Sequence, residues 1–324
     1  MRLPYRLSCY ALALTSLFAG TARAADSCLV GISMFTLGAP YYAAALDAAS
    51  KKAKAMGCDV TTSDGRNDMS KQISDVEDMV AKGINVLLID PRDPEGLVPA
   101  VNAASKAGVK VVVFDSALNP RAKYLTLVQS SNDQNGRLTG AWLANKMKGQ
   151  PLKIALLSGS KGNVVGEERR LGVIRGLTEA QLQQSGSAGF QIVGQGWGDW
   201  TQEGGLKAME DLVVAHPDIN VVLGENDSMV LGARKALESA GKADKVILLA
   251  AADGQKEAYR LIKEGKYGTT GLNDPDQIGT LAAQFGVEAH QGKLAADFPR
   301  VYYTKPAAVT RENVDKFYKA DSIF

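Results

Sequence analysis

Carboxylates, amides, aromatic rings and arginines recur in this sequence where a short apolar run gives way to a helix-like stretch. They occupy the stretches 35–42 (FTLGAPYY), 115–116 (DS), 167–170 (EERR), 198–200 (GDW), 225–227 (END), 253 (D) and 273–274 (ND). Sugar rings expose apolar C–H faces that stack on aromatic planes, and their hydroxyl groups pair with carboxylates, amides and guanidinium groups. These residue types predict a site for a polyhydroxylated small molecule.

Other chemistries have less support in the sequence. The phosphate loops GxGxxG and GxxxxGK[ST] are absent, and the glycine-rich stretch 194–198 lacks their spacing. A glycosidase would hold one carboxylic acid protonated beside a second carboxylate, and nothing marks Asp115 and Asp253 as such a pair. No G-x-S-x-G motif occurs, and His216 precedes a proline in a helix-end turn. We expect no catalytic residue, cofactor or metal, and an exported carbohydrate-active enzyme is the competing class.

Most of these side chains also have a purely structural explanation. Tyr41 and Tyr42 could pack at a helix start, where helical spacing lets only one of them face inward. Asp115 and Asp253 could serve as turn or cap residues, which is a common role of Asp after a strand. Asp227 is expected to cap the helix that follows it rather than to touch a ligand.

The arginines have a structural explanation as well, but the tryptophan is harder to explain in this way. One of Arg169 and Arg170 is expected to be a solvated helix charge. Trp200 lies inside a Gly-Asp-Trp-Thr turn, a position that core packing explains poorly. The prediction of a site therefore depends on the shared position of these residues at strand ends rather than on any single residue.

The elements that must position them alternate regularly between strand and helix. A buried strand at 28–34 precedes a helix at 41–56, and a helix at 70–82 places Ile73, Val76 and Met79 on one face. Further helices are expected at 94–107 and at 167–183. This alternation predicts βαβ units with parallel sheets and right-handed crossovers.

About eleven strands are too many for one small open sheet, so we expect an α/β fold of two doubly wound lobes. The first lobe is expected to comprise residues 25–130 and 274–302, and the second to comprise 131–273 and 303–324. No Pro/Gly/Ser-rich linker separates them, so short crossings should join the lobes. In such sheets ligands bind beyond the carboxyl ends of the strands, where the polar residues lie.

The N-terminus has the pattern of a secretory signal peptide. Arg2 and Arg6 precede an apolar run at 7–18, and Ala22-Arg23-Ala24 is a small-x-small cleavage pattern, so residues 1–24 should be removed after Ala24. The run is too short to span a bilayer, and no lipobox precedes Cys28. With a formal net charge of +2 and no basic cluster, nucleic-acid binding is not expected. We expect a periplasmic protein.

Cys9 would leave with the signal peptide, and Cys28 and Cys58 remain. Each is expected at the start of a strand, and the two strands should be parallel neighbours about 4.8 Å apart. A disulfide and a pair of buried thiols both fit this placement, and an oxidising compartment favours the disulfide. Two cysteines this far apart, without a nearby histidine, have poor spacing for zinc.

Several motifs resemble the ribose-binding-protein group, the type I periplasmic solute-binding proteins of sugar ABC transporters. They are the stretch 31–42 with TLGAPYY, Gln72 together with LLIDP at 87–91, ENDSMVLGA at 225–233 and PDQIG at 275–279. The resemblance covers nearly the whole mature chain. It implies two lobes that are joined by three crossings and close on a sugar.

The resemblance also implies roles for individual residues. Tyr41 and Tyr42 would be the stacking aromatics of the first lobe, and Trp200 that of the second. The polar contacts would come from Asp115, Arg169, Asn226, Asp253 and Asn273. Asn226 would face the ligand while Asp227 caps the helix behind it.

This sequence departs from the family pattern at two positions. Ala39 replaces an asparagine before the paired aromatics, and Ser116 replaces an arginine after the first-lobe aspartate. Each lost polar contact would cost about 1–3 kcal/mol if the same ligand left it unpaired. We therefore expect another pentose, a hexose or a polyol rather than ribose itself.

The resemblance implies partners as well. The closed form would dock, as a monomer, on an inner-membrane ABC permease, and a chemoreceptor is a second candidate partner. A protein with only a sensory role is one alternative. A repressor with the same lobes is another, but it would need a helix-turn-helix where the signal peptide lies.

Overall fold

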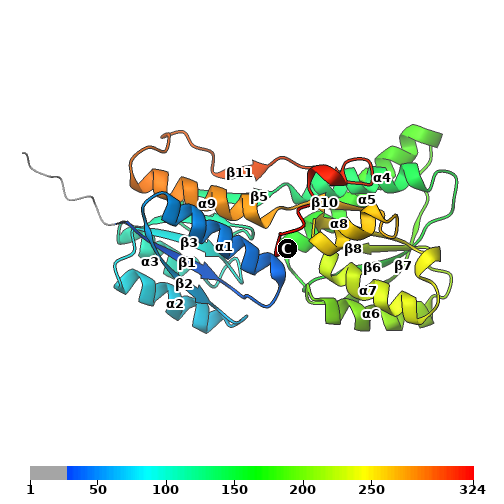
Figure 1. Cartoon of the computed structure of the whole chain (residues 1–324), viewed down its shortest axis with the longest axis horizontal. Helices are drawn as coiled ribbons and strands as arrows, with labels where there is room; N and C mark the ends of the chain where they lie inside the picture. Colours follow the sequence, from blue (N-terminus) through cyan, green and yellow to red (C-terminus); the bar gives the residue numbers. More distant parts are fainter. Residues whose placement is uncertain (1–27) are drawn as a thin grey trace, which may run out of the picture.

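Two α/β lobes lie side by side along the long axis of the molecule (Figure 1). This computed structural model describes residues 28–324. The expected signal peptide at 1–24, its cleavage site after Ala24, and Cys9 lie outside the described residues. Within residues 28–324, every helix lacks the length or the apolar character needed to cross a bilayer.

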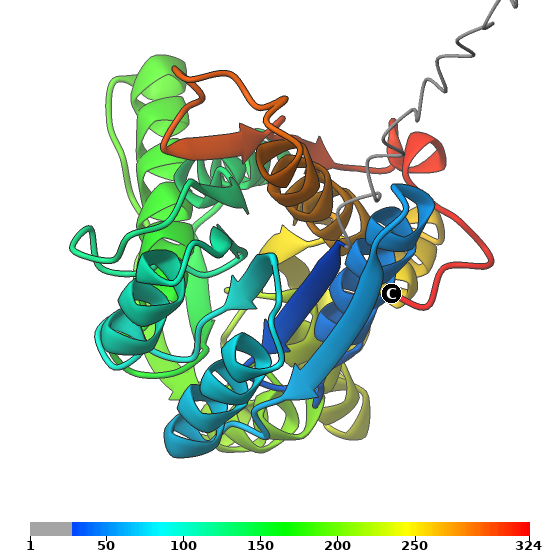
Figure 2. The same ribbon diagram turned by 90° about the vertical axis from the view of Figure 1, so that its left-hand side faces the viewer.

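The first lobe is a parallel sheet with helices on both faces. Its strand order is β2-β1-β3-β4-β5-β11. Its elements are β1 (Leu29–Met34), α1 (Pro40–Ala55), β2 (Asp59–Asp64), α2 (Met69–Ala81), β3 (Val86–Asp90), α3 (Val98–Lys106), β4 (Lys110–Phe114), β5 (Thr126–Ser130), α9 (Pro275–His290) and β11 (Val301–Thr304). Helices α1 and α9 cover one face, and α2 and α3 cover the other (Figure 2). Because both faces are covered, β3 is buried at every position and is apolar from Val86 to Ile89.

The second lobe repeats this architecture with the strand order β7-β6-β8-β9-β10-β12, in which only β12 is antiparallel to its neighbour. Its elements are α4 (Asn132–Lys146), β6 (Lys153–Ser158), α5 (Val164–Ser185), β7 (Gln191–Trp197), α6 (Gln202–Ala215), β8 (Val221–Gly224), α7 (Asp227–Ser239), η1 (Ala243–Lys245), β9 (Ile247–Asp253), α8 (Lys256–Lys263), β10 (Thr269–Leu272), β12 (Ala308–Val309) and η2 (Val314–Lys316). Helices α4 and α5 cover one face, and α6, α7 and α8 cover the other.

Two helices start three or more residues away from the predicted positions. Helix α3 begins at Val98 instead of 94, because the Asp93 carboxylate accepts the N–H groups of Glu95 and Gly96 and holds a turn there. Helix α5 begins at Val164 instead of 167, because Asn163 caps it through the N–H of Gly166. Helix α5 is the element that carries Arg169.

The chain crosses between the lobes at 131, at 273–274 and at 305–307. The last crossing differs from the expected boundary after residue 302. Tyr303 and Thr304 still pair with Gln129 and Ser130 of β5, so they belong to the first sheet. The hydrogen bonds of β11 therefore move this boundary two residues along the chain.

Helices α4 and α5 approach each other closely through glycines on both. A Cβ atom on Gly140 would lie 2.2 Å from the carbonyl oxygen of Val173, and one on Gly176 would lie 2.1 Å from that of Arg137. No other residue type fits at these distances without moving a backbone. The contact fixes α5 against α4, so it also fixes side chains at the N-terminal ends of both helices.

The segment after β12 returns from the second lobe to the first. Phe317 packs beside Tyr259 of α8, with ring centroids 6.4 Å apart. Phe324 instead packs against Tyr41 and Ala44 of α1, so it contacts the first lobe. Assigning all of residues 303–324 to the second lobe was therefore wrong at both ends of that range.

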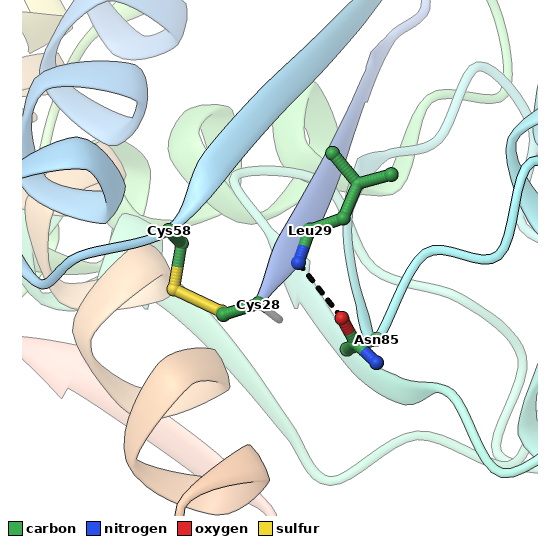
Figure 3. The surroundings of a disulfide bond; sticks show 4 residues. All are labelled: Cys28, Leu29, Cys58 and Asn85. Carbon is green, nitrogen blue, oxygen red and sulfur yellow. Dashed lines mark hydrogen bonds between the residues drawn. A yellow bond between two sulfur atoms is a disulfide. The ribbon is translucent and has the colours of Figure 1, made fainter. Parts of the chain in front are cut away.

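A disulfide joins Cys28 and Cys58, whose Cα atoms lie 4.6 Å apart (Figure 3). The two residues lie just before β1 and β2, which run parallel with Leu29 opposite Asp59. On the other side of β1, the N–H of Leu29 donates to Oδ1 of Asn85 at 2.7 Å. The bridge thus attaches the edge strand β2 to the interior of the first sheet.

Replacing Cys28 and Cys58 together with alanine should lower the free energy of unfolding by about 3–4 kcal/mol, because the bridge closes a long loop in the unfolded chain. Urea denaturation measures the change. The free energy of unfolding of the wild type in reductant should match that of the variant. Reductant should not change the free energy of unfolding of the variant. Equal denaturation midpoints for the oxidised wild type and the variant would contradict this account.

Candidate functional site

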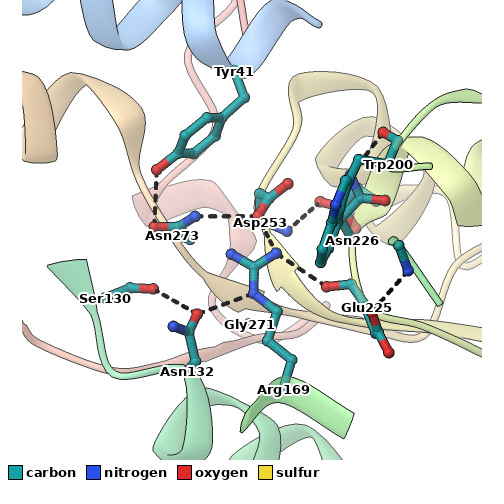
Figure 4. Close-up of polar contacts among 12 residues, drawn as sticks. Tyr41, Ser130, Asn132, Arg169, Trp200, Glu225, Asn226, Asp253, Gly271 and Asn273 are labelled. Carbon is teal, nitrogen blue, oxygen red and sulfur yellow. Dashed lines mark hydrogen bonds and ion pairs between the residues drawn. The ribbon is translucent and has the colours of Figure 1, made fainter. Parts of the chain in front are cut away.

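The eight candidate residues meet in one connected cluster between the lobes, and Figure 4 labels all of them except Tyr42 and Asp115. Each lies near the carboxyl end of a strand or in the first turns of a helix. They are Tyr41 and Tyr42 on α1, Asp115 after β4, Arg169 on α5, Trp200 before α6, Asn226 before α7, Asp253 at the end of β9 and Asn273 after β10. Their convergence follows from the parallel sheets, whose carboxyl ends face each other across the crossings.

Hydrogen bonds link the first lobe to the second through Tyr41. Its hydroxyl donates to Oδ1 of Asp115 at 2.6 Å and lies 3.2 Å from Oδ1 of Asn273. Asn273, in the second crossing, in turn donates from Nδ2 to Oδ1 of Asp253 at 3.2 Å. Burial, and then the negative charge of Asp115, raise the pKa of Tyr41 well above its ordinary value, so the phenol stays protonated and remains a donor.

Arg169 is the central cation of the cluster and is almost fully buried. Its guanidinium pairs with Asp253 at 2.9 Å, donates to Oδ1 of Asn132 at 3.0 Å and donates to the carbonyl of Glu225 at 3.2 Å. Burial alone would lower its pKa, but the charges of Asp253 and then Asp115 raise it. Partners on three segments, namely β9, α4 and the loop after β8, therefore hold this side chain in one position.

The ring of Trp200 lies beside Arg169 and is held there by a strained turn. Asp199 and Trp200 have φ angles of 46° and 64°, in the left-handed region that non-glycine residues seldom adopt. The indole lies directly over Gly159, where a Cβ atom would be 2.1 Å from the ring. Its other neighbour is the Arg169 guanidinium, 5.8 Å from a ring centroid. The turn thus holds a flat aromatic surface beside the buried arginine.

The capping role expected of Asp227 belongs to Asn226 in the structure. Asn226, not Asp227, caps α7, because its Oδ1 accepts the N–H of Met229 at 3.0 Å. Its Nδ2 donates to the carbonyl of Trp200 at 3.1 Å. Asp227 is the first residue of α7, and its side chain is turned away from the cap position.

The Asp227 carboxylate instead organises the loop after β9. Its Oδ2 accepts the N–H groups of Gly254 at 2.7 Å and Gln255 at 2.8 Å, and its Oδ1 accepts the hydroxyl of Tyr267 at 2.7 Å. Burial raises its pKa, against the opposing effect of the Tyr267 hydrogen bond. Asp227 therefore fixes the end of β9, which carries Asp253.

The paired tyrosines divide two functions between them. Tyr41 makes the polar contacts, whereas Tyr42 packs edge-on against Phe35 and Tyr41, with centroid distances of 4.8 and 5.5 Å. This agrees with the expectation that helical spacing points the two side chains differently. Tyr42 is half-buried and also packs against the first-lobe core.

Three polar residues of the cluster were not predicted from the sequence. Asn132 orients Arg169, and Glu225 accepts the N–H of Gly159 at 2.8 Å while pairing with Arg170. Arg170 is partly buried and its partner Glu225 is fully buried, so the expectation of one solvated arginine was wrong. The signal was present for Glu225, which stands in the polar stretch 225–227.

The third is Asp90, the last residue of β3. It is fully buried, and neither oxygen of its carboxylate has a hydrogen-bond partner among the described residues. Burial, and then the charge of Asp115, raise its pKa well above the ordinary value. A buried carboxylate without a partner is unfavourable, so this residue needs a reason beyond packing.

The cluster as a whole resembles a recognition surface more than a reactive centre. Apart from the Asp90 carboxylate, the donors and acceptors described above are already paired, and aromatic faces lie beside them. Within residues 28–324, no group of three or more His, Cys, Asp or Glu side chains is placed to hold a metal ion. Such an arrangement can contact a hydroxylated ring from several sides.

Comparisons with known proteins agree with this geometry. The periplasmic binding protein domain family matches residues 30–294. The chain is 36% identical to the ribose import binding protein of Bacillus subtilis over 264 residues, 82% of each chain. It is 30% identical to the Escherichia coli (strain K12) ribose import binding protein over 291 residues, which cover 89% of this chain and 93% of the relative.

Solved structures show the same fold. A periplasmic solute-binding protein from Actinobacillus succinogenes with bound D-allose matches with a TM-score of 0.81 at 26% identity, over 90% of this chain and 100% of that one. A solute-binding protein from Mycobacterium smegmatis with bound glycerol matches with a TM-score of 0.80 at 31% identity, over 91% and 98%. The chain therefore belongs to the periplasmic binding protein family and has the type I, two-lobed fold of its sugar-binding members.

Proposed function

We propose that this protein binds a sugar or a polyol between its lobes and delivers it to the permease of an ABC importer in the inner membrane. The observation that carries the proposal is the cluster between the lobes, in which aromatic, acidic, amide and guanidinium groups face one space. Family membership supports a solute-binding protein rather than an enzyme.

In this proposal the ligand is the bridge that closes the protein. Tyr41 and Asp115 would contact it from the first lobe, and Trp200, Arg169 and Asp253 from the second. A ligand in the open form reaches only one set of contacts, whereas the closed form provides both. Ligand binding therefore shifts the open–closed equilibrium toward closure by the difference in contact energy.

The proposed contact set is the one expected from the sequence, with roles adjusted to the geometry. Ring faces would come from the aromatics and hydroxyl contacts from the polar groups. The set is Tyr41, Tyr42, Asp115, Arg169, Trp200, Asn226, Asp253 and Asn273. Asn226 would contribute mainly by holding Trp200 in place, because its amide already caps α7 and binds the Trp200 carbonyl.

The ligand is proposed to differ from ribose. Ala39 and Ser116 offer fewer polar groups on the first lobe than ribose binders do, which leaves more room there. The similar proteins bind varied molecules, among them D-allose, glycerol and, in a protein from Bacillus halodurans, myo-inositol. A hexose, another pentose or a polyol fits these observations.

The family indicates a periplasmic location. We propose that export uses residues 1–24 as a signal peptide and that the mature protein begins at residue 25. The mature protein would act as a monomer, and a chemoreceptor is a second proposed partner.

After export from a Gram-negative host, intact mass spectrometry should give the mass of residues 25–324, and a retained leader would contradict the proposed cleavage.

Replacing Trp200 with alanine should weaken ligand binding by about 2 kcal/mol, or about thirtyfold, because the stacking surface is lost. Isothermal titration with a panel of sugars and polyols measures this. Trp197, the last residue of β7, is partly exposed and provides the matched control. If Trp197→Ala and Trp200→Ala lost ligand affinity equally, or if neither lost any, the stacking role of Trp200 would be refuted.

Asn226 allows capping to be separated from the support of Trp200. Asn226→Ser keeps a capping oxygen but loses the donor to the Trp200 carbonyl, so stability should change by less than about 0.5 kcal/mol while affinity falls. Asn226→Ala should lose the cap as well, at a cost of about 1 kcal/mol. Thermal melts with and without ligand measure both quantities. Unchanged affinity in both variants would remove Asn226 from the site.

A further inference from the structure

Residues 314–324 form a C-terminal tail whose first part belongs to the second lobe. Val314, in η2, is buried in the core of that lobe, and Phe317 packs against the same core beside Tyr259 of α8. These contacts attach the start of the tail to the second lobe, so the position of its end is limited by the few residues that follow.

The end of the tail is mostly exposed until its last residue. Residues 319–321 are exposed, and Ile323 has an exposed fraction of 60%. Between them, Lys256 of α8 donates to the carbonyl of Ser322. Phe324 is then buried, with an exposed fraction of only 7%. Terminal residues are seldom ordered unless a contact holds them, and here the holding contact is made by the final side chain.

Phe324 is buried against Tyr41, so the tail ends on the first lobe. The C-terminus lies between the two lobes in Figure 1. The ring centroids of Phe324 and Tyr41 are 5.5 Å apart with an interplanar angle of 84°, an edge-to-face arrangement. Ala44, on the same face of α1, belongs to this contact, and the ring of Tyr42 also meets Tyr41 edge-on at 5.5 Å. Two aromatic neighbours therefore hold the Tyr41 ring, one from its own helix and one from the end of the chain.

The direction of this ring decides where the Tyr41 hydroxyl lies. The hydroxyl donates to Oδ1 of Asp115 at 2.6 Å and lies 3.2 Å from Oδ1 of Asn273. Tyr41 is in the first turn of α1, and the N-cap residue of this helix is Ala39, whose methyl side chain cannot accept a capping hydrogen bond. Because no cap reinforces this turn, the packing of the ring has a larger share in fixing the hydroxyl.

We infer that Phe324, the last residue of the chain, is a positioning residue that directs the Tyr41 hydroxyl toward the ligand. This inference rests on the proposed function, in which Tyr41 contacts the ligand from the first lobe. Phe324 acts through the Tyr41 ring and is held in place by a tail anchored on the second lobe. One lobe thus orients a contact residue of the other.

Calorimetric titration of the mature protein with the panel of sugars and polyols tests this role. In Phe324→Ala, affinity for a compound that the wild type binds should fall about five- to tenfold, because the Tyr41 ring loses one of its two aromatic neighbours. Ile323→Ala removes an exposed side chain of the same tail and should leave affinity within about twofold. Phe324→Leu keeps an apolar side chain at the position and should recover most of the affinity. Unchanged affinity in Phe324→Ala would overturn the inference.

A double-mutant cycle separates an action through Tyr41 from a general effect on the fold. Tyr41→Phe keeps the ring and removes the hydroxyl. In that background Phe324→Ala should lower affinity by less than about twofold, because the group that Phe324 positions is already gone. An equal loss in both backgrounds would show that Phe324 acts independently of the hydroxyl, which contradicts the inference.

Spectrophotometric titration of the tyrosine phenols tests the contact without a ligand, while circular dichroism monitors the fold. Burial, and then the charge of Asp115, raise the pKa of Tyr41 well above its ordinary value. Phe324→Ala should expose the phenol and lower its pKa, so that one more phenol than in the wild type ionises below about pH 11. Adding Tyr41→Phe should remove this extra phenol.

The two kinds of measurement distinguish the possible failures. If no extra phenol appears although the wild type binds a sugar or polyol, the inference fails and the proposed function stands. If the extra phenol appears but no compound of the panel binds the wild type, the proposed function fails and Phe324 still orients Tyr41.

Discussion

The buried ion pair between Arg169 and Asp253 is the interaction on which the rest of the site depends. The exposed fractions of the two side chains are 5% and 8%, so water compensates neither charge. Removing either partner would leave a buried charge alone, at a cost of about 3–5 kcal/mol. The pair also connects α5 to the end of β9, and from there hydrogen bonds lead through Asn273 to Tyr41 on the first lobe.

This constraint explains why nearby features of the second lobe take unusual forms. The close α4–α5 contact places Asn132 where it can hold Arg169, and this contact requires glycine at positions such as Gly140. Asp227 holds the loop after Asp253 through backbone N–H groups. Trp200 adopts a strained backbone above the guanidinium. Each feature stabilises one orientation of the arginine, so the second lobe is organised before any ligand arrives.

The sequence predicted the architecture because its signals are periodic and local. Apolar runs, helical spacing and the strand-end rule located two parallel-sheet lobes, and the resemblance to the ribose-binding-protein group selected the eight candidate residues that meet in one cluster. The finer assignments depended on geometry that no pattern encodes. Whether Asn226 or Asp227 caps α7 is decided by backbone dihedral angles, and the importance of Asn132 appears only when α4 and α5 meet. Asp90 lies inside the LLIDP motif, but only its burial without a partner distinguishes it.

The last residues of the chain add a non-covalent connection to the three peptide crossings. Between Phe317, beside Tyr259, and Phe324, beside Tyr41, the chain passes the edge of the crossings, and Lys256 holds the carbonyl of Ser322 on the way. Any separation of the lobes must either stretch this segment or release one of its anchors. A reporter or affinity label appended after Phe324 would emerge beside α1, at the moving joint. A label inserted directly before Cys28 would instead lie near the Cys28–Cys58 bridge, at the opposite end of β1 from the cluster between the lobes.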